Sequence, residues 1–189
     1  MCGRYMAVES EDLLMKLIYD ETRAKNPEVR LHSGEIFPTN TAPVIGGRNV
    51  SPFPAKWGYP QFNGKGVIIN ARAETADTKM TFKDSLRYRR CAIPTTGYLE
   101  WSQSKEKYRL NLPEGKLLYL AGFYQEFADG IRFVILTTAP NESVTDIHDR
   151  MPVILLQRGI GEWVNDREKA MKMMRSPMPP LVRMHNGVV

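Results

Sequence analysis

Cys2, in the opening segment MCGRY, carries two functional groups that could act together. Removal of Met1 would leave a cysteine with both a thiol and a free α-amine, a combination that no internal residue offers. The pKa of an α-amine is about 8, so part of it is neutral and nucleophilic at physiological pH. Such an amine can form an imine with an aldehyde, as an activated lysine does. The thiol of the same residue could then close a thiazolidine ring, because the attack is intramolecular.

Other candidates are polar side chains in segments that otherwise look buried or tightly turned. A charged group is expensive to bury without a partner, so these residues need an ion pair or a cleft. They are Asn70, Arg72 and Glu74 in NARAE, Glu100 in GYLEW, and His148 and Arg150 in DIHDR. Residue type alone leaves structural roles open. Asn70 could cap a strand end, Arg72 and Glu100 could form ordinary ion pairs, and His148 could be a hydrogen-bonded structural histidine.

Several kinds of cofactor site are not indicated by the sequence. It contains no Walker A motif and no GxSxG segment, and the GKG at Gly64 lacks the third glycine of a dinucleotide fingerprint. The three histidines are far apart and have no metal-ligand spacing with either cysteine. Cys91, in RRCAIP, is interpreted as a small core residue. We therefore expect neither a metal nor a cofactor.

Length, charge and cysteine usage limit the class of protein. A chain of 189 residues is long enough for one domain with its own core, so we expect a single domain over residues 1–189. Two cysteines without CxxC spacing, no secretory-type leader and no membrane-length apolar run predict an intracellular protein without a membrane segment. The net charge of +5 comes partly from SLRYRR and fits a polyanion partner, although a charged run is more often a solvated face.

The elements that would position these residues are strands, with a few helices between them. Ser10, Glu11 and Asp12 predict a helix start, and Leu13, Leu14, Leu17 and Ile18 would form its buried face. The Pro- and Gly-rich stretch from Phe37 to Pro60 argues against helix and for a loop-rich surface. Strands are predicted at GVIINA, CAIP, KYRLNL, KLLYLAGFY, IRFVILTTA and PVILL, and helices at TFKDSLRYRR and GEWVNDREKAMKMMR. Without a βαβ rhythm, this order favours an α+β fold: a curved, mainly antiparallel, barrel-like sheet with flanking helices.

Five ordered blocks resemble one known family. They are CGRY from Cys2, WG at Trp57, NARAET from Asn70, RRCAIPTTGYLEW from Arg89, and ILTTAPNESVTDIHDRMPVIL from Ile135. Together they resemble the SRAP (SOS response associated peptidase) family, which includes bacterial and mammalian sensors of abasic sites in single-stranded DNA. Two blocks depart from the family pattern: Leu99 follows Tyr98 where GFYEW is usual, and FPTNTAP replaces an arginine-containing segment.

The resemblance implies a function and a set of site residues. Family members sense abasic sites in single-stranded DNA and, after loss of Met1, become covalently linked to the abasic sugar through the N-terminal cysteine. By motif, the catalytic residues would be Cys2, Asn70, Glu100 and His148, with Glu100 assisting sugar opening and imine formation and His148 assisting ring closure and reversal. The DNA-binding residues would be Arg4, Trp57, Arg72, Trp101, Thr138 and Arg150. The arginines would hold phosphates, and the tryptophans would stack on bases or form the wall of the site.

Three alternatives stay open at this point. A thiol peptidase would use Cys2, His148 and Glu100, and removal of Met1 would be an autocatalytic remnant of such activity. An abasic-site lyase would cleave the strand through the same imine. A non-catalytic single-strand binding module would rely on the Arg and Trp residues alone. Nothing in the sequence demands more than a monomer, and for a bacterial member we expect action on DNA in the cytoplasm, at the nucleoid, within the SOS response.

Overall fold

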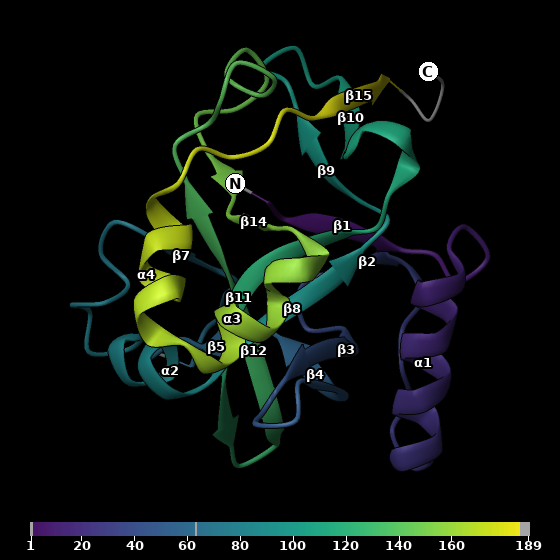
Figure 1. Cartoon of the computed structure of the whole chain (residues 1–189), viewed down its shortest axis with the longest axis vertical. Helices are drawn as coiled ribbons and strands as arrows, with labels where there is room; N and C mark the ends of the chain where they lie inside the picture. The colour runs from purple at the N-terminus through teal and green to yellow at the C-terminus, as the bar shows by residue number, and fades with distance from the viewer. Residues whose placement is uncertain (1, 63, 186–189) are drawn as a thin grey trace.

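A closed five-stranded barrel forms the centre of the computed structural model, which describes residues 2–62 and 64–185 (Figure 1). Around the ring, the barrel strands are β12 (Gly130–Thr138), β4 (Ser51–Trp57), β3 (Thr41–Gly46), β8 (Arg90–Thr95) and β11 (Leu118–Phe127). Each strand pairs with the next in this order, and β11 pairs with β12 to close the ring. β12 runs parallel to β4, and the other pairs of the ring are antiparallel.

Short strands extend the barrel, and a second sheet lies against it. β7 (Asn70–Arg72) and β13 (Met151–Pro152) pair with β12, and β14 (Ile154–Leu155) pairs with β11. β5 (Tyr59–Pro60) and β6 (Val67–Ile68) pair with each other. The second sheet has the order β15 (Val182–His185), β10 (Lys107–Asn111), β9 (Gly97–Trp101), β1 (Arg4–Ala7) and β2 (Gly34–Ile36). The predicted α+β class with a curved, mainly antiparallel sheet is confirmed.

The helices lie on two sides of the barrel (Figure 1). α1 (Leu13–Lys25) packs against β3 and β4 on one side. On the other side, α2 (Lys83–Tyr88) packs against β8 and β11, and α3 (Ile160–Asn165) packs against β8 and α4 (Arg167–Arg175). Two short 3-10 turns cover Pro113–Gly115 and Gln157–Gly159. No helix in the described ranges is both long and apolar enough to span a membrane.

The predicted first helix exists, and its predicted buried face is right at Ile18, partly right at Leu14 and wrong at Leu13 and Leu17. The helix begins after Asp12, whose carboxylate accepts a hydrogen bond from the Met15 amide at 2.9 Å, rather than after Ser10. Leu13 and Leu17 are 74% and 55% exposed. The face toward the barrel consists of Met15, Ile18, Tyr19 and Thr22, which also recur at helical spacing. Ile18 belongs to both faces, so packing shifted the buried face around the helix from Leu13 and Leu17 toward Met15 and Tyr19.

The stretch from Phe37 to Pro60 contains strands, so its interpretation as a loop-rich surface is wrong. Pro43 and Pro54 lie directly opposite each other in the β3–β4 ladder. The β8 ladder on β3 covers only Ile45 and Gly46, and the β12 ladder on β4 begins at Lys56. Each proline therefore lies where its strand has one ladder partner, and the missing N–H removes no hydrogen bond from the barrel.

The predicted C-terminal helix is two helices separated at Asp166. The backbone of Asp166 is extended (φ −111°, ψ 110°), and its carboxylate accepts a hydrogen bond from the Lys169 amide at 3.0 Å. An N-cap of this kind starts a new helix within an otherwise helical pattern. The break lets α3 pack on β8 while α4 covers the neighbouring surface.

Candidate functional site

Cys2 is fully buried at the start of the described chain, next to the second sheet. Its carbonyl accepts a hydrogen bond from Nδ2 of Asn70 at 2.9 Å, and its thiol donates to the carbonyl of Arg4 at 3.7 Å. Burial, and then the nearby carboxyl of Glu100, raise the pKa of the thiol well above its ordinary value. The thiol is therefore protonated at neutral pH. The predicted removal of Met1 concerns a residue that lies outside those that the structure describes.

Glu100 lies on β9, the central strand of the second sheet, and is only 3% exposed. Burial raises the pKa of its carboxyl to about 7, and the negative charge of Asp149 contributes to the shift. Alternate residues of a strand point to opposite faces, so Glu100 shares the face of Tyr98 while Trp101 shares the face of Leu99. A carboxyl that is about half ionised at neutral pH can both donate and accept a proton.

His148 lies in the loop between β12 and β13, where its side chain is 25% exposed. Nδ1 of the ring accepts a hydrogen bond from the Arg150 amide at 3.0 Å, and a carboxylate oxygen of Asp149 lies 2.7 Å from the same nitrogen. Burial lowers the pKa of the imidazole, so the neutral ring dominates at pH 7. The hydrogen bond from Arg150 needs the lone pair of Nδ1, whereas a hydrogen bond to Asp149 needs a proton on the same nitrogen, so each protonation state of Nδ1 satisfies one of the two contacts. Protonation would turn Nδ1 into a donor toward Asp149.

Asn70 and Arg72 lie on β7, which pairs in parallel with β12 through the register Ile135 to Asn70 and Thr137 to Arg72. This pairing brings the Asn70 amide against the backbone of Cys2. The amide oxygen of Asn70 is buried and has no hydrogen-bond partner within the described residues. Arg72 is exposed and makes no ion pair with any residue that the structure describes. Asn70 therefore offers a buried hydrogen-bond acceptor, and Arg72 offers an exposed positive charge.

Arg4 and Trp101 belong to a cluster at the exposed edge of the site. The Arg4 guanidinium donates to Glu35 at 2.9 Å and lies 4.4 Å from the ring centre of Phe37 and 5.1 Å from that of Trp101. Lys107 binds the other carboxylate oxygen of Glu35 at 3.1 Å and lies over the same tryptophan ring. Phe37 belongs to FPTNTAP, the segment that departs from the family pattern. Two cations thus flank Trp101 and share one carboxylate.

Arg150 makes a two-pronged ion pair with Glu74, at 2.7 and 2.8 Å, and donates to the Thr137 carbonyl at 2.7 Å. Thr138, the next residue on β12, is partly exposed and lies opposite Met151 in the β12–β13 ladder. A phosphate bound at Arg150 would have to share the guanidinium with Glu74.

Trp57 was predicted to stack on a DNA base or to form the wall of the site, and in this structure its ring is fully buried. Its indole nitrogen donates to the Ile69 carbonyl at 3.0 Å, next to Asn70. Its ring lies parallel to Phe133, with centroids 6.3 Å apart, and is tilted against Tyr5 at 5.3 Å. Trp57 supports the wall behind β7, which is the other role that the sequence left open for it.

The structure brings Cys2, Asn70 and Glu100 together, with the His148–Asp149 pair close enough for Asp149 to affect the pKa of Glu100. Three participants were not singled out from the sequence: Glu35, Lys107 and Asp149. Glu35 and Lys107 come from separate strands, and only the β1–β2 and β9–β10 pairings show that they share an edge. Asp149 had a local signal, since it lies between two chosen residues. Across residues 2–62 and 64–185, no three His, Cys, Asp or Glu side chains form a group that could hold a metal ion.

The fold and the site define a class of protein: a barrel-based α+β domain in which a cysteine near the N-terminus is buried beside an asparagine and a carboxyl with a raised pKa. The chain belongs to the family described as SOS response associated peptidase (SRAP), which it matches over residues 1–186.

Named relatives and solved structures agree with this assignment. The abasic site processing protein YoqW of Bacillus subtilis is 32% identical over 203 aligned positions, which cover 95% of this chain and 87% of that protein. The abasic site processing protein YedK of Escherichia coli is 27% identical over 87% of this chain and 79% of its own. A crystal structure of a protein from Bacteroides thetaiotaomicron has the same fold, with a TM-score of 0.80 at 21% identity over 97% of this chain and 91% of its own.

Proposed function

We propose that this protein processes abasic sites in single-stranded DNA by forming a covalent bond between Cys2 and the abasic sugar, which shields the lesion. The names of its relatives support abasic-site processing. The observation that carries the finer proposal is the environment of Cys2. Its backbone is held by Asn70, and its side chain lies within electrostatic range of a carboxyl that is able to transfer protons at neutral pH.

The proposed reaction uses the α-amine that loss of Met1 would expose. The neutral amine attacks the aldehyde of the ring-opened sugar, a carbinolamine forms, and water leaves to give an imine. The thiol then adds to the imine carbon, and its proton passes to the nitrogen, so that a thiazolidine ring results. Ring closure is intramolecular, which favours it over hydrolysis of the open imine.

Each neighbouring residue has a role in this sequence. Glu100, with a pKa of about 7, takes the proton from the sugar hydroxyl during ring opening and returns one to the departing water. The buried amide oxygen of Asn70 accepts a hydrogen bond from the new amine or from a sugar hydroxyl. His148, with a lowered pKa and with Asp149 beside Nδ1, moves a proton during ring closure. Arg4, Arg72 and Arg150 hold phosphates, and Trp101 offers a ring beside them.

The raised pKa of the Cys2 thiol favours this reaction over thiol peptidase chemistry. A cysteine peptidase attacks through a thiolate, which its site stabilises by lowering the thiol pKa. Burial and Glu100 have the opposite effect on Cys2. A protonated thiol suits a reaction in which the amine attacks first and the sulfur adds afterwards to an electrophilic imine.

Intact-mass measurement tests the proposal. Protein incubated with a single-stranded oligonucleotide that contains one abasic site should gain the mass of the oligonucleotide, less one water, on the form that lacks Met1. Cys2→Ala should show no such species, whereas Cys91→Ala, which alters the other buried cysteine, should retain it. Glu100→Gln should slow the reaction by about 100- to 10,000-fold. Reductive methylation of the α-amine should also abolish the adduct. A wild-type protein that gains no oligonucleotide mass would exclude the proposal.

A further inference from the structure

We propose that the groove between α4 and residues 73–87, here called the α2–α4 groove, is a second contact surface for single-stranded nucleic acid, which binds the phosphates of the strand flanking the lesion. The inference rests on the proposed function for its substrate class. The four cations that carry it, Lys83, Arg87, Arg167 and Arg175, lie outside the family blocks and have no role in the proposed chemistry.

The groove consists of two adjoining hollows. One, of about 150 Å³, is lined by residues of α2 and α4 that include Lys83, Arg87 and Arg167. The other, of about 220 Å³, is lined by residues that include Glu74, Thr138 and Arg175. Asp77 and Met171 line both hollows, so the two hollows lie side by side.

The groove reaches the candidate site at one end. Glu74 holds the Arg150 guanidinium, and Thr138 lies next to the Thr137 carbonyl to which Arg150 donates. From there, one face of α4 carries Arg175, Met171 and Arg167 at intervals of four residues. Eight residues of helix span about 12 Å, the length of about three to four stacked nucleotides. The groove therefore leads from the site to α2 along a length suited to a short stretch of strand.

The cations of the groove differ from the other basic residues of α4 in their pairing. Lys169 and Lys172, which do not line the groove, form ion pairs with Glu162 and Glu168. Within the described ranges, Lys83, Arg87, Arg167 and Arg175 form no ion pair. Two carboxylates, Asp77 and Asp84, face these four cations, and Glu74 is already neutralised by Arg150. The four cations therefore outnumber these two carboxylates, and such a net positive charge suits a phosphate backbone.

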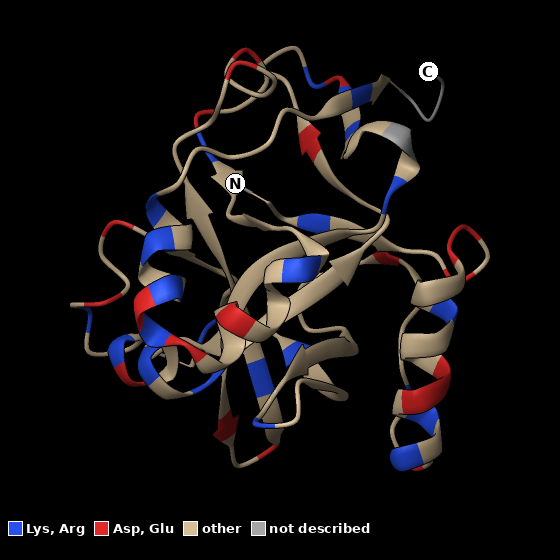
Figure 2. Ribbon diagram, viewed as in Figure 1, with Lys and Arg blue, Asp and Glu red and all other residues tan. Residues whose placement is uncertain are grey.

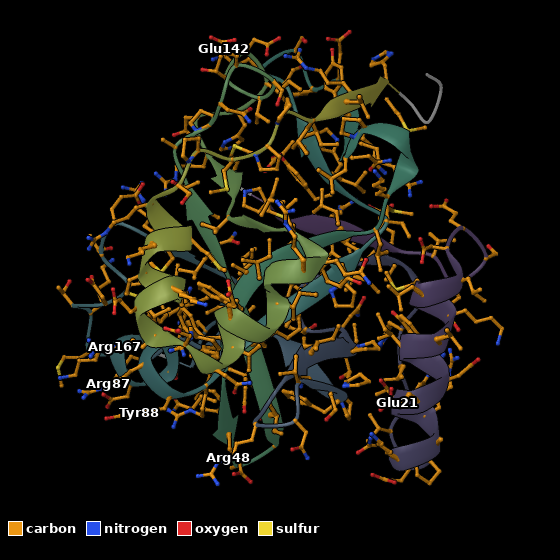
Figure 3. The ribbon with its side chains drawn as sticks, viewed as in Figure 1. Glu21, Arg48, Arg87, Tyr88, Glu142 and Arg167 are labelled. Atoms are coloured by element: carbon orange, nitrogen blue, oxygen red, sulfur yellow. The ribbon has the colours of Figure 1, made fainter. Side chains whose placement is uncertain are left out.

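An exposed aromatic residue lies at the far end of the groove. Tyr88 is 65% exposed, and the guanidinium carbon of Arg87 lies 5.0 Å from its ring centre. Figure 3 shows Arg87, Tyr88 and Arg167 at the same edge of the molecule, and Figure 2 shows basic residues on both α2 and α4 at this side. An aromatic ring next to cations is the usual platform on which a base of single-stranded nucleic acid stacks. The basic run SLRYRR thus joins a surface that two distant segments build together.

Binding of an undamaged single-stranded DNA oligonucleotide, followed by fluorescence anisotropy at several salt concentrations, tests the inference without the covalent step. We expect Arg87→Gln/Arg167→Gln to weaken binding about 10-fold at low salt. The slope of log affinity against log salt should fall by about 1.4, because each lost phosphate contact contributes about 0.7. Lys83→Gln/Arg175→Gln should have the same effect. The control Lys169→Gln/Lys172→Gln makes the same change in net charge on α4 outside the groove, and should leave the slope unchanged.

The length of the substrate separates this inference from the proposed function. A short abasic oligonucleotide that ends within about three nucleotides of the lesion should crosslink equally well to the wild type and to both groove variants. A longer abasic oligonucleotide should crosslink faster than the short one to the wild type, but not to the groove variants. If the groove variants and the control lost affinity for the oligonucleotide equally, the effect would be one of net charge and the inference would be overturned. Unchanged affinity in the groove variants would overturn it as well. Failure of the wild type to crosslink would overturn the proposed function, and the anisotropy result alone would then decide whether the groove binds single-stranded DNA.

Discussion

At the scale of single residues, the site depends on how burial changes proton affinity. The same desolvation raises the pKa of Glu100 and of the Cys2 thiol and lowers that of His148, because in each case it disfavours the charged form. The result is a protonated thiol, a carboxyl that titrates near neutrality and a neutral imidazole. This set suits imine formation, in which protons move between oxygen and nitrogen while the nucleophile stays uncharged.

Glu100 should reduce the stability of the fold at high pH. Its pKa is about 7 in the folded protein and close to the ordinary value of 4.5 when unfolded, so the folded state binds the proton more tightly. Its stabilising effect is fully present below pH 4.5 and is lost as pH rises through 7. We expect Glu100→Gln to be more stable than the wild type at pH 8, by about 1–3 kcal/mol, and no more stable at pH 4.

Urea unfolding at the two pH values measures this difference. Glu142→Gln, at the exposed carboxylate labelled in Figure 3, should change the free energy of unfolding by less than about 0.5 kcal/mol at both. The assigned environment of Glu100 would be contradicted if Glu100→Gln gave the same change in stability at pH 4 and pH 8.

At the scale of elements, the close contact between three barrel strands depends on a glycine, Gly122 on β11. A Cβ atom added at Gly122 on β11 would lie 2.5 Å from the Val134 carbonyl oxygen and 2.6 Å from Ile93. The carbonyl belongs to β12, the neighbour with which β11 closes the ring, and cannot move without disturbing the ladder. Gly122 therefore permits the close contact between β8, β11 and β12.

Gly122→Ala should lower the free energy of unfolding by about 1–3 kcal/mol, because the added methyl group overlaps with backbone. Gly161→Ala provides the matched control, since a Cβ there would meet nothing within 4 Å and the residue lies inside α3. That substitution should stabilise the protein by about 0.5–1 kcal/mol through helix propensity. Urea midpoints of the two variants should therefore move in opposite directions, and a shared direction would contradict this account of the barrel.

At the scale of the whole molecule, Arg90 connects segments that are far apart in the chain. It is 4% exposed, and its guanidinium donates to the carbonyls of Leu86 and Arg87 at the end of α2. It also donates to the carbonyls of Trp163 and Val164 at the end of α3. These are last-turn carbonyls that have no partner within their own helices, so one side chain satisfies the ends of two helices.

Arg90→Met should reduce the free energy of unfolding by about 2–4 kcal/mol, because several buried carbonyls lose their donor at once. Arg90→Lys should recover little of this loss, since an ammonium cannot reproduce the planar fork. Arg48→Met, at an exposed arginine labelled in Figure 3, should change stability by less than about 0.5 kcal/mol. Thermal unfolding compares the three, and equal losses at Arg48 and Arg90 would rule out the connecting role.

The sequence by itself determined the strand-rich α+β class, a short basic helix within TFKDSLRYRR, and Cys2, Glu100 and His148 as the residues to examine. These depend on local patterns: alternation, turn residues, and polar groups among apolar neighbours. Only the tertiary structure decided which face of α1 is buried and that prolines occupy barrel strands. It also showed that Trp57 lies in the core, that Glu35 joins Arg4 to Lys107, and that α2 and α4 line one groove. Such features depend on contacts between distant segments and on the burial that those contacts produce, and no local window of sequence contains them.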